Sequence, residues 1–169
     1  MISRARKAAT EVLNSFGYKV PLDIHALVSQ HGIEVQTHKM ERSIPGMMVT
    51  TKSAALITLN ESLPLNQQRF VLAHLLGHFV LHGKSADVFV DRTTPITGEG
   101  PEIRKRIMQE NEANEFAGEL LMPEAVVRDR FETSRPYPYN MESLRPLAAQ
   151  FGINEFVLAI RLTQLGLAA

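Results

Sequence analysis

Hydrophobic and polar positions divide the first part of the chain into short helices and strands. Apolar residues recur at helical intervals over residues 3–15, and a second short helix is predicted between Pro21 and Gly32. Three segments that alternate apolar and polar side chains, or are bounded by turn residues, then predict strands. The predicted strands are 33–38, 45–51 and 54–60. Because they follow one another closely, we expect a small three-stranded antiparallel sheet.

The rest of the chain has mainly helical periodicity. A long helix is predicted over 64–82, and a loop rich in glycine, proline and threonine follows over 83–101. Further helices are predicted over 102–122, 126–131, 141–151 and 154–165. The order of helices, sheet and helices indicates an α+β fold. We expect a single domain over 1–169 that ends in a helical hairpin, with a helix-turn-helix-like subdomain over about 124–169.

Composition narrows the possible chemistry. The 169 residues are 44% hydrophobic and 21% charged, and the formal net charge is zero, so no general attraction to nucleic acid is expected. There is no cysteine, so a metal site would have to use histidine, aspartate or glutamate. No segment reaches the roughly 20 apolar residues of a membrane span, and the N-terminus lacks a signal-peptide core. We therefore expect a soluble, cytoplasmic protein that does not enter membranes.

The segment RFVLAHLLGHFVLH (69–82) carries the first candidate metal ligands. His74 and His78 are four residues apart, so on a helix they share one face and could bind the same ion. His82 lies about 12 Å along the axis from His74, too far to bind the same ion together with both. Gly77 leaves room for another segment to approach closely. A pair of histidines at this spacing also arises by chance, or as hydrogen-bonded core residues.

A third ligand is predicted on the helix over 102–122. Glu110 and Asn114 share a face, so Glu110 could bind metal while Asn114 accepts a hydrogen bond from a ligating imidazole. Glu112 lies about 200° around the helix from Glu110, so these two carboxylates are alternatives. A solvated acidic face is the competing interpretation, especially for Glu112 and Glu115.

Several motifs together resemble the ImmA/IrrE family of metallopeptidases. The segment around the histidine helix is similar to the family pattern R-F-x-x-A-H-E-x-G-H, and ENEANEFAGELLMP (110–123) matches E-x-x-A-N/D-x-F-A-x-x-L-L-M-P. PLDIHALVSQHGIEV and IPGMMV resemble the family's first helix and strands, and LAAQFGINEFVLAIRLTQLGL resembles its closing helices. The resemblance runs over nearly the whole chain.

The resemblance implies a zinc-peptidase fold in which His74, His78 and Glu110 bind Zn²⁺. It also implies a regulatory role on a protein partner. Members of the family cleave or otherwise inactivate helix-turn-helix repressors, often in prophage, mobile-element or stress-response circuits. The oligomeric state does not follow from the resemblance.

One residue departs from the family pattern. Leu75 stands where the pattern has the glutamate that takes a proton from the nucleophilic water. Loss of general acid–base help lowers the rate by about 10²–10⁴, or roughly 3–5 kcal/mol of barrier. We favour a catalytically impaired or inactive family member. The alternatives are a peptidase with a relocated base and a non-enzymatic, metal-free or antitoxin-like binding module. Glu99 and Glu102 are candidates for the relocated base, and Tyr137 or Tyr139 could polarise a carbonyl.

The C-terminal helices permit a second hypothesis. A helix, a glycine turn and a helix over 141–165 are compatible with a DNA-binding helix-turn-helix. Arg161 is the only basic residue of the last helix, so a structural hairpin is favoured and direct DNA binding is not expected. The preceding segment SRPYPYN (134–140) could contact a protein partner.

Overall fold

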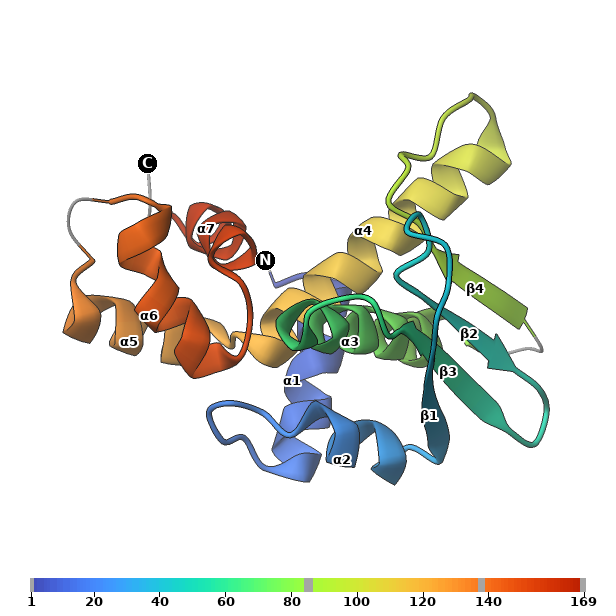
Figure 1. Ribbon diagram of the computed structural model, residues 1–169, viewed down its shortest axis with the longest axis horizontal. Helices are drawn as coiled ribbons and strands as arrows, with labels where there is room; N and C mark the ends of the chain where they lie inside the picture. The colour runs from blue at the N-terminus through green and yellow to red at the C-terminus, as the bar shows by residue number, and fades with distance from the viewer. Residues whose placement is uncertain (1, 84–86, 137–138, 168–169) are drawn as a thin grey trace.

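The computed structural model describes residues 2–83, 87–136 and 139–167, which form seven helices and four strands (Figure 1). The predicted α+β class is therefore confirmed. The helices are α1 (Arg4–Phe16), α2 (Ile24–Gln30), α3 (Leu65–His82), α4 (Pro101–Leu121), α5 (Glu124–Ser134), α6 (Met141–Phe151) and α7 (Glu155–Gln164). The strands are β1 (Ile33–His38), β2 (Gly46–Thr50), β3 (Ala55–Asn60) and β4 (Asp87–Asp91).

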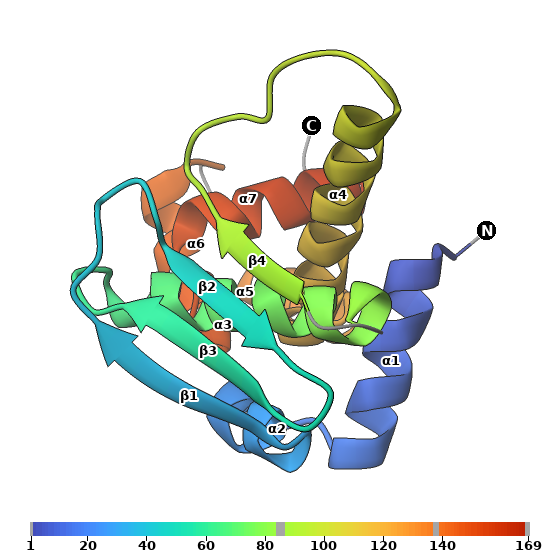
Figure 2. The same cartoon turned by 90° about the vertical axis from the view of Figure 1, so that its right-hand side faces the viewer.

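The sheet differs from the prediction in both strand number and direction. Its order is β1-β3-β2-β4, with β1 parallel to β3 and the other two pairs antiparallel (Figure 2). The prediction of three antiparallel strands was therefore wrong in two respects. β2 and β3 form a hairpin, and β1 joins the far edge of β3 instead of pairing with β2. β4 comes from the segment that was expected to be loop.

α3 is the central helix of the molecule and lies across one face of the sheet (Figure 2). It packs against α1, α2 and α4 as well as β2, β3 and β4, which explains why apolar residues surround it. Gly77 sets its distance from α4, since a Cβ there would lie 3.1 Å from the backbone oxygen of Ala113. The predicted close approach at Gly77 is thus confirmed. It brings the helix that carries the two histidines against the helix that carries the glutamates.

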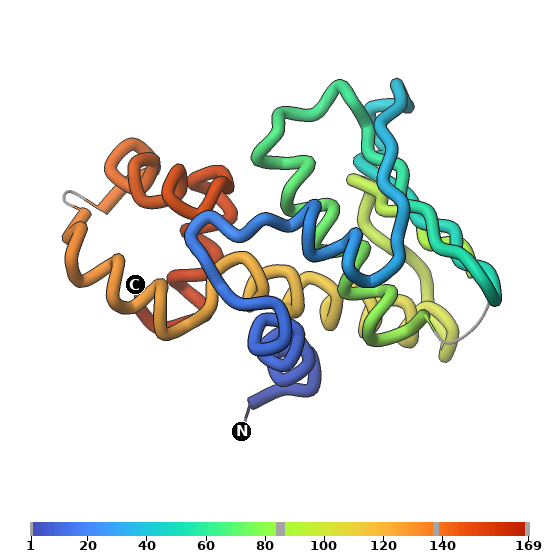
Figure 3. The backbone as a smooth tube through the Cα atoms, turned by 90° about the horizontal axis from the view of Figure 1, so that it is seen from below, coloured from blue at the N-terminus to red at the C-terminus, as the bar shows by residue number. Residues whose placement is uncertain are grey.

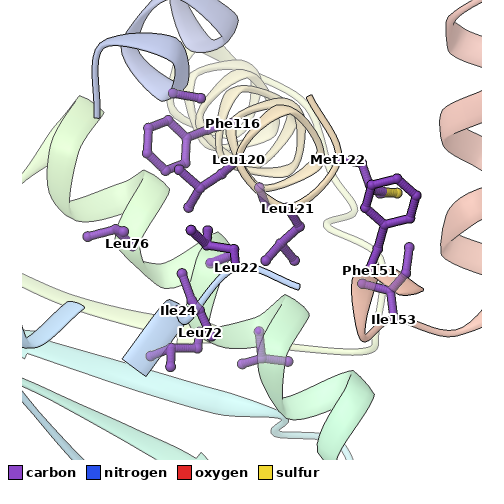
Figure 4. Close-up of a cluster of buried hydrophobic side chains, with 14 of the residues drawn as sticks. Leu22, Ile24, Leu72, Leu76, Phe116, Leu120, Leu121, Met122, Phe151 and Ile153 are labelled. Atoms are coloured by element: carbon purple, nitrogen blue, oxygen red, sulfur yellow. The ribbon is translucent and has the colours of Figure 1, made fainter. Parts of the chain in front are cut away.

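The hydrophobic core continues from α3 into the C-terminal helices. Leu72 and Leu76 of α3 belong to the same cluster of buried side chains as Phe116 and Leu120 of α4, and Phe151 of α6 lies on the other side of the α4 end (Figure 4). Helices α5, α6 and α7 gather at the end of the molecule away from the sheet (Figures 1 and 3). In the described part of the chain, no helix has the length and apolar character needed to cross a bilayer.

The C-terminal hairpin forms as predicted. α6 begins at a capping box made by Asn140 and Ser143, and Gly152 ends it in the left-handed conformation at φ 67°. Arg161 of α7 is only 3% exposed and forms an ion pair with Glu119 of α4. The one basic side chain of α7 is therefore used inside the protein.

Candidate metal centre

Three potential ligands converge where α3 packs against α4. Nε2 of His74 lies 3.1 Å from Nε2 of His78, and the two nitrogens lie 3.2 and 3.4 Å from the two carboxylate oxygens of Glu110. One donor atom from each residue lies within 4.8 Å of the others. Ligands around tetrahedral zinc, with bonds of about 2.0–2.2 Å, are separated by about 3.3–3.6 Å. The donor types and their spacing therefore fit a divalent metal such as zinc.

The environment of the histidines leaves their Nε2 atoms free to face Glu110. His74 and His78 are 3% and 2% exposed, and the Glu110 side chain is 34% exposed. Nδ1 of His74 lies 3.0 Å from Oδ1 of Asn114, which can accept its proton. This is the contact that sequence spacing predicted for Asn114. The His78 ring stacks on Phe89 of β4, with 4.8 Å between ring centroids.

The surroundings shift the pKa values of the three clustered residues in different directions. Burial lowers the pKa of His74, but hydrogen bonds to Glu110 and Asn114 and the charge of Asp91 outweigh it, so the net pKa is raised. Burial lowers the pKa of His78, and neighbouring His74 lowers it further. Burial acts to raise the pKa of Glu110, but its bonds to both histidines hold it well below the ordinary value. Of the two histidines, His74 is therefore the one whose surroundings favour the protonated form, beside a Glu110 whose surroundings favour the ionised form.

This proton predicts how metal affinity depends on pH. A ligating imidazole must be neutral, so a cation has to displace the proton from His74. Since the pKa of His74 is raised above 6.5, affinity is expected to fall as pH drops through that higher value, by about tenfold per pH unit for one proton. Calorimetric titration with Zn²⁺ or Co²⁺ between pH 5.5 and 8.5 measures this slope. An affinity that is constant over the range would contradict the assignment.

Leu75 stands where the family pattern has a proton-accepting glutamate, and its side chain lies against β2. Leu75 is fully buried, and a Cβ on Gly46 of β2 would lie 3.1 Å from its side chain. Gly46 pairs with Asp91 of β4, so the two share one face of the sheet. Burial raises the pKa of Asp91. The charges of His74 and His78 lower this pKa and the charge of Glu110 raises it, so the net pKa is raised. Asp91 was not among the predicted site residues, because its strand was expected to be loop.

Of the proposed relocated groups, the carboxylates Glu99 and Glu102 do not join the cluster of His74, His78 and Glu110. Glu102 is exposed in the first turn of α4, eight residues before Glu110, which is about 12 Å along the axis. Glu99 precedes that helix. Tyr139 lies in sequence between α5 and α6, two of the helices at the end of the molecule away from the sheet (Figure 1). Tyr137 falls outside the residues that the structure describes.

The other glutamates of α4 separate into distinct environments. Glu112 lies 2.9 Å from Nε2 of His82 and is not part of the cluster with Glu110. Glu119 is 5% exposed and pairs with both Arg6 and Arg161. The interpretation of these residues as one solvated face therefore does not hold for Glu112 or Glu119.

A pocket between α4 and α7 is lined by Asn114, the residue whose side chain contacts Nδ1 of His74. Its volume is about 740 Å³, and it includes Asn111 and Asn114, which are close to Glu110 on α4. Phe70 of α3 also lines it, as do Phe156 and Ile160 of α7, which are 62% and 46% exposed. The pocket therefore adjoins the candidate metal centre through Asn114, and its lining includes both apolar and polar side chains.

Comparison with known proteins agrees with this arrangement. The model of the IrrE N-terminal-like domain matches residues 28–163. The chain is 30% identical over 111 residues to Metallopeptidase ImmA of Bacillus subtilis (strain 168), covering 66% of this chain and 57% of the relative. It is 31% identical over 103 residues to Uncharacterized immunity region protein 2 of Bacillus phage phi105, covering 61% of this chain and 60% of that protein.

A solved structure shows the same fold in a larger chain. The Mycobacterium tuberculosis transcriptional regulator aligns with 96% of this chain at a TM-score of 0.66 and 18% identity, and 47% of that chain is covered. This chain thus matches less than two thirds of the length of each of these three relatives. The family model itself covers most of the present chain. The chain therefore belongs to the ImmA/IrrE family.

Proposed function

We propose that this chain is a zinc-binding, peptidase-like regulatory domain that acts on a protein partner with impaired hydrolysis. His74, His78 and Glu110 are the proposed zinc ligands. The observation that carries the proposal is their convergence on one point between α3 and α4, with donor separations of 3.1–3.4 Å. Membership of a metallopeptidase family supports the same assignment.

Different side chains would orient the histidine ligands and compensate the charge of the metal at this centre. Asn114 holds His74 in the tautomer that presents Nε2, and Phe89 holds the plane of the His78 ring. Glu110 supplies the negative charge that compensates a cation in a largely buried site. Zinc, when bound, polarises a peptide carbonyl and lowers the pKa of a water molecule.

Leu75 is the reason that hydrolysis is proposed to be slow. Its side chain has no proton acceptor, and its buried position keeps that part of the site apolar. The proposed ligands are unaffected by this residue, so metal binding and partner recognition do not require a glutamate there. A regulator of this kind would act mainly by binding.

We propose a helix-turn-helix repressor as the partner, as the resemblance to the family implies. The names of the relatives support regulation in general: one comes from a phage immunity region, and a structural neighbour is a transcriptional regulator. The pocket lined by Phe156 and Ile160 beside the centre offers a place for an apolar side chain of a polypeptide. Direct contact of α7 with DNA is not proposed, because Arg161 is buried and paired.

Metal analysis of the purified protein tests the proposal. We expect about one zinc per chain, as for a site with three protein ligands. His78→Ala removes one of the three and is expected to abolish binding at micromolar zinc. His25→Ala on the exposed surface of α2 is the matched control and should retain the full content. Absence of zinc from the unsubstituted chain would instead favour the second candidate function, a non-enzymatic binding or antitoxin-like module.

A further inference from the structure

We propose that His82 and Glu112 are positioning residues that fix the tautomer of His78 and thereby strengthen metal binding. The inference rests on the proposed function, because it concerns the same centre. Nδ1 of His82 lies 3.3 Å from Nδ1 of His78, and Nε2 of His82 lies 2.9 Å from a carboxylate oxygen of Glu112. The three side chains therefore form a continuous hydrogen-bonded chain that ends at the proposed ligand.

The positions of the protons along this chain follow from the donors and acceptors. A carboxylate only accepts, so Nε2 of His82 donates to Glu112, and in the uncharged form of the ring this leaves Nδ1 as the acceptor. Nδ1 of His78 must then donate to that acceptor. With its proton on Nδ1, His78 presents the lone pair of Nε2 toward Glu110 and His74. This is the tautomer that a metal ligand requires at Nε2.

The environment keeps this arrangement in place. The side chain of His82 is 6% exposed and that of Glu112 is 22% exposed, so water competes little for these bonds. Arg4 of α1 lies 3.6 Å from the other oxygen of Glu112 and donates to the backbone oxygen of Leu81. His82 is too far along α3 to bind the same ion. It is one turn from His78 and contacts Nδ1 of that ring, on the side opposite the proposed metal.

His74 also has a hydrogen-bond acceptor at the ring nitrogen that does not face the proposed metal. Its Nδ1 faces the oxygen of Asn114, so each proposed histidine ligand has an acceptor on its far nitrogen. The two acceptors come from different sources, an amide on α4 for His74 and a second histidine of α3 for His78. Outer partners of this kind change metal affinity by about 10- to 100-fold when removed.

The substitutions His82→Asn and His82→Leu separate this role from simple packing. Asparagine can place Oδ1 where Nδ1 of His82 accepts the proton, whereas leucine fills similar space without an acceptor. We expect His82→Leu to weaken zinc affinity about 10- to 100-fold. His82→Asn should remain close to the unsubstituted chain. Equal affinities of the leucine and asparagine variants would overturn the proposal.

A second measurement does not depend on metal. Long-range ¹H–¹⁵N NMR spectra of the full chain report which nitrogen of His78 carries the proton, both with and without zinc. We expect the proton on Nδ1 in both states, and loss of this preference in His82→Leu. A proton on Nε2 of His78 without zinc would overturn the inference. Failure of zinc to bind while Nδ1 remains protonated would reject the proposed metal function alone.

The variant Glu112→Gln provides a test if a substitution at His82 prevents folding. Glutamine keeps an oxygen that accepts from Nε2 of His82 but removes the charge, so a smaller loss of zinc affinity is expected than with His82→Leu. Glu34→Gln on β1 makes the same change in net charge away from the centre and should have no effect. Unchanged affinity in Glu112→Gln together with an unchanged His78 tautomer in Glu112→Ala would overturn the role of Glu112.

Discussion

Leu75→Glu is expected to raise the rate of peptide hydrolysis by the zinc-loaded protein by about 10²–10⁴, the usual contribution of a general base. The substitution adds one carboxylate beside the proposed ligands and removes none of them. The measurement is turnover of a quenched fluorescent peptide library, or of an unfolded protein such as casein, at saturating zinc. The increase should be greatest near neutral pH, where the added carboxylate is ionised.

The structure around residue 75 also sets the cost of this change. Leu75 is fully buried and faces Gly46, with Asp91 on the neighbouring strand. A carboxylate in this position would lose hydration and meet the negative charge of Asp91, and both effects raise its pKa. A raised pKa suits a proton acceptor that works near neutral pH, but a buried carboxyl group lowers stability. Thermal unfolding should therefore be measured before activity.

Leu75→Gln is the matched control for this experiment. Glutamine has the size and polarity of glutamate but does not accept a proton at neutral pH, so the rate should stay at the level of the unsubstituted chain. Combining Leu75→Glu with His78→Ala should abolish any gain. A folded, zinc-bound Leu75→Glu protein without activity would show that the centre lacks more than a base, which would favour a binding function.

The residues of the candidate centre were largely predictable because they occur in pairs at four-residue spacing on two helices. His74 and His78 share a face at four-residue spacing, and so do Glu110 and Asn114. Packing of α3 on α4 at Gly77 then brings the two faces together. The contacts around the centre were not predictable in this way. The bond from Glu112 to His82 joins two helices whose relative rotation sequence spacing does not specify.

The sheet was less predictable, because strand order depends on contacts between segments distant in sequence. Segments adjacent in sequence favour antiparallel hairpins, but β3 lies between β1 and β2. β4 has only five residues, and its first two are exposed, so its alternation is weak beside the glycines and prolines that follow. Two neighbours of the centre, Phe89 and Asp91, belong to this strand, which is why the sequence did not indicate them.

Glu119→Ala is expected to lower the free energy of unfolding by about 3–5 kcal/mol, the range for removing one partner of a buried ion pair. Glu119 joins four helices near the end of α4. It accepts from Arg6 of α1, pairs with Arg161 of α7, and accepts from the backbone N–H of Glu124 at the start of α5. Urea denaturation followed by circular dichroism measures the loss.

The large effect is expected because Arg161 has no alternative carboxylate among the described residues. Its side chain is buried against α4, and its other bond is to the backbone oxygen of Met122. Arg6 is less affected, since it keeps Glu124 and is partly exposed. A double variant, Glu119→Leu with Arg161→Met, removes both buried charges and should lose much less stability than Glu119→Ala.

This comparison also tests how the C-terminal hairpin is attached to the candidate centre. The pocket beside the centre is lined by α4 and α7, and Arg161 itself lines it, so its shape depends on the same ion pair. If the pair only adds stability, the double variant should keep the zinc affinity and the partner binding of the unsubstituted chain. If it positions α7, partner binding should fall in the double variant although folding and zinc affinity are preserved. A loss below 1 kcal/mol in Glu119→Ala would contradict the buried pairing of Arg161.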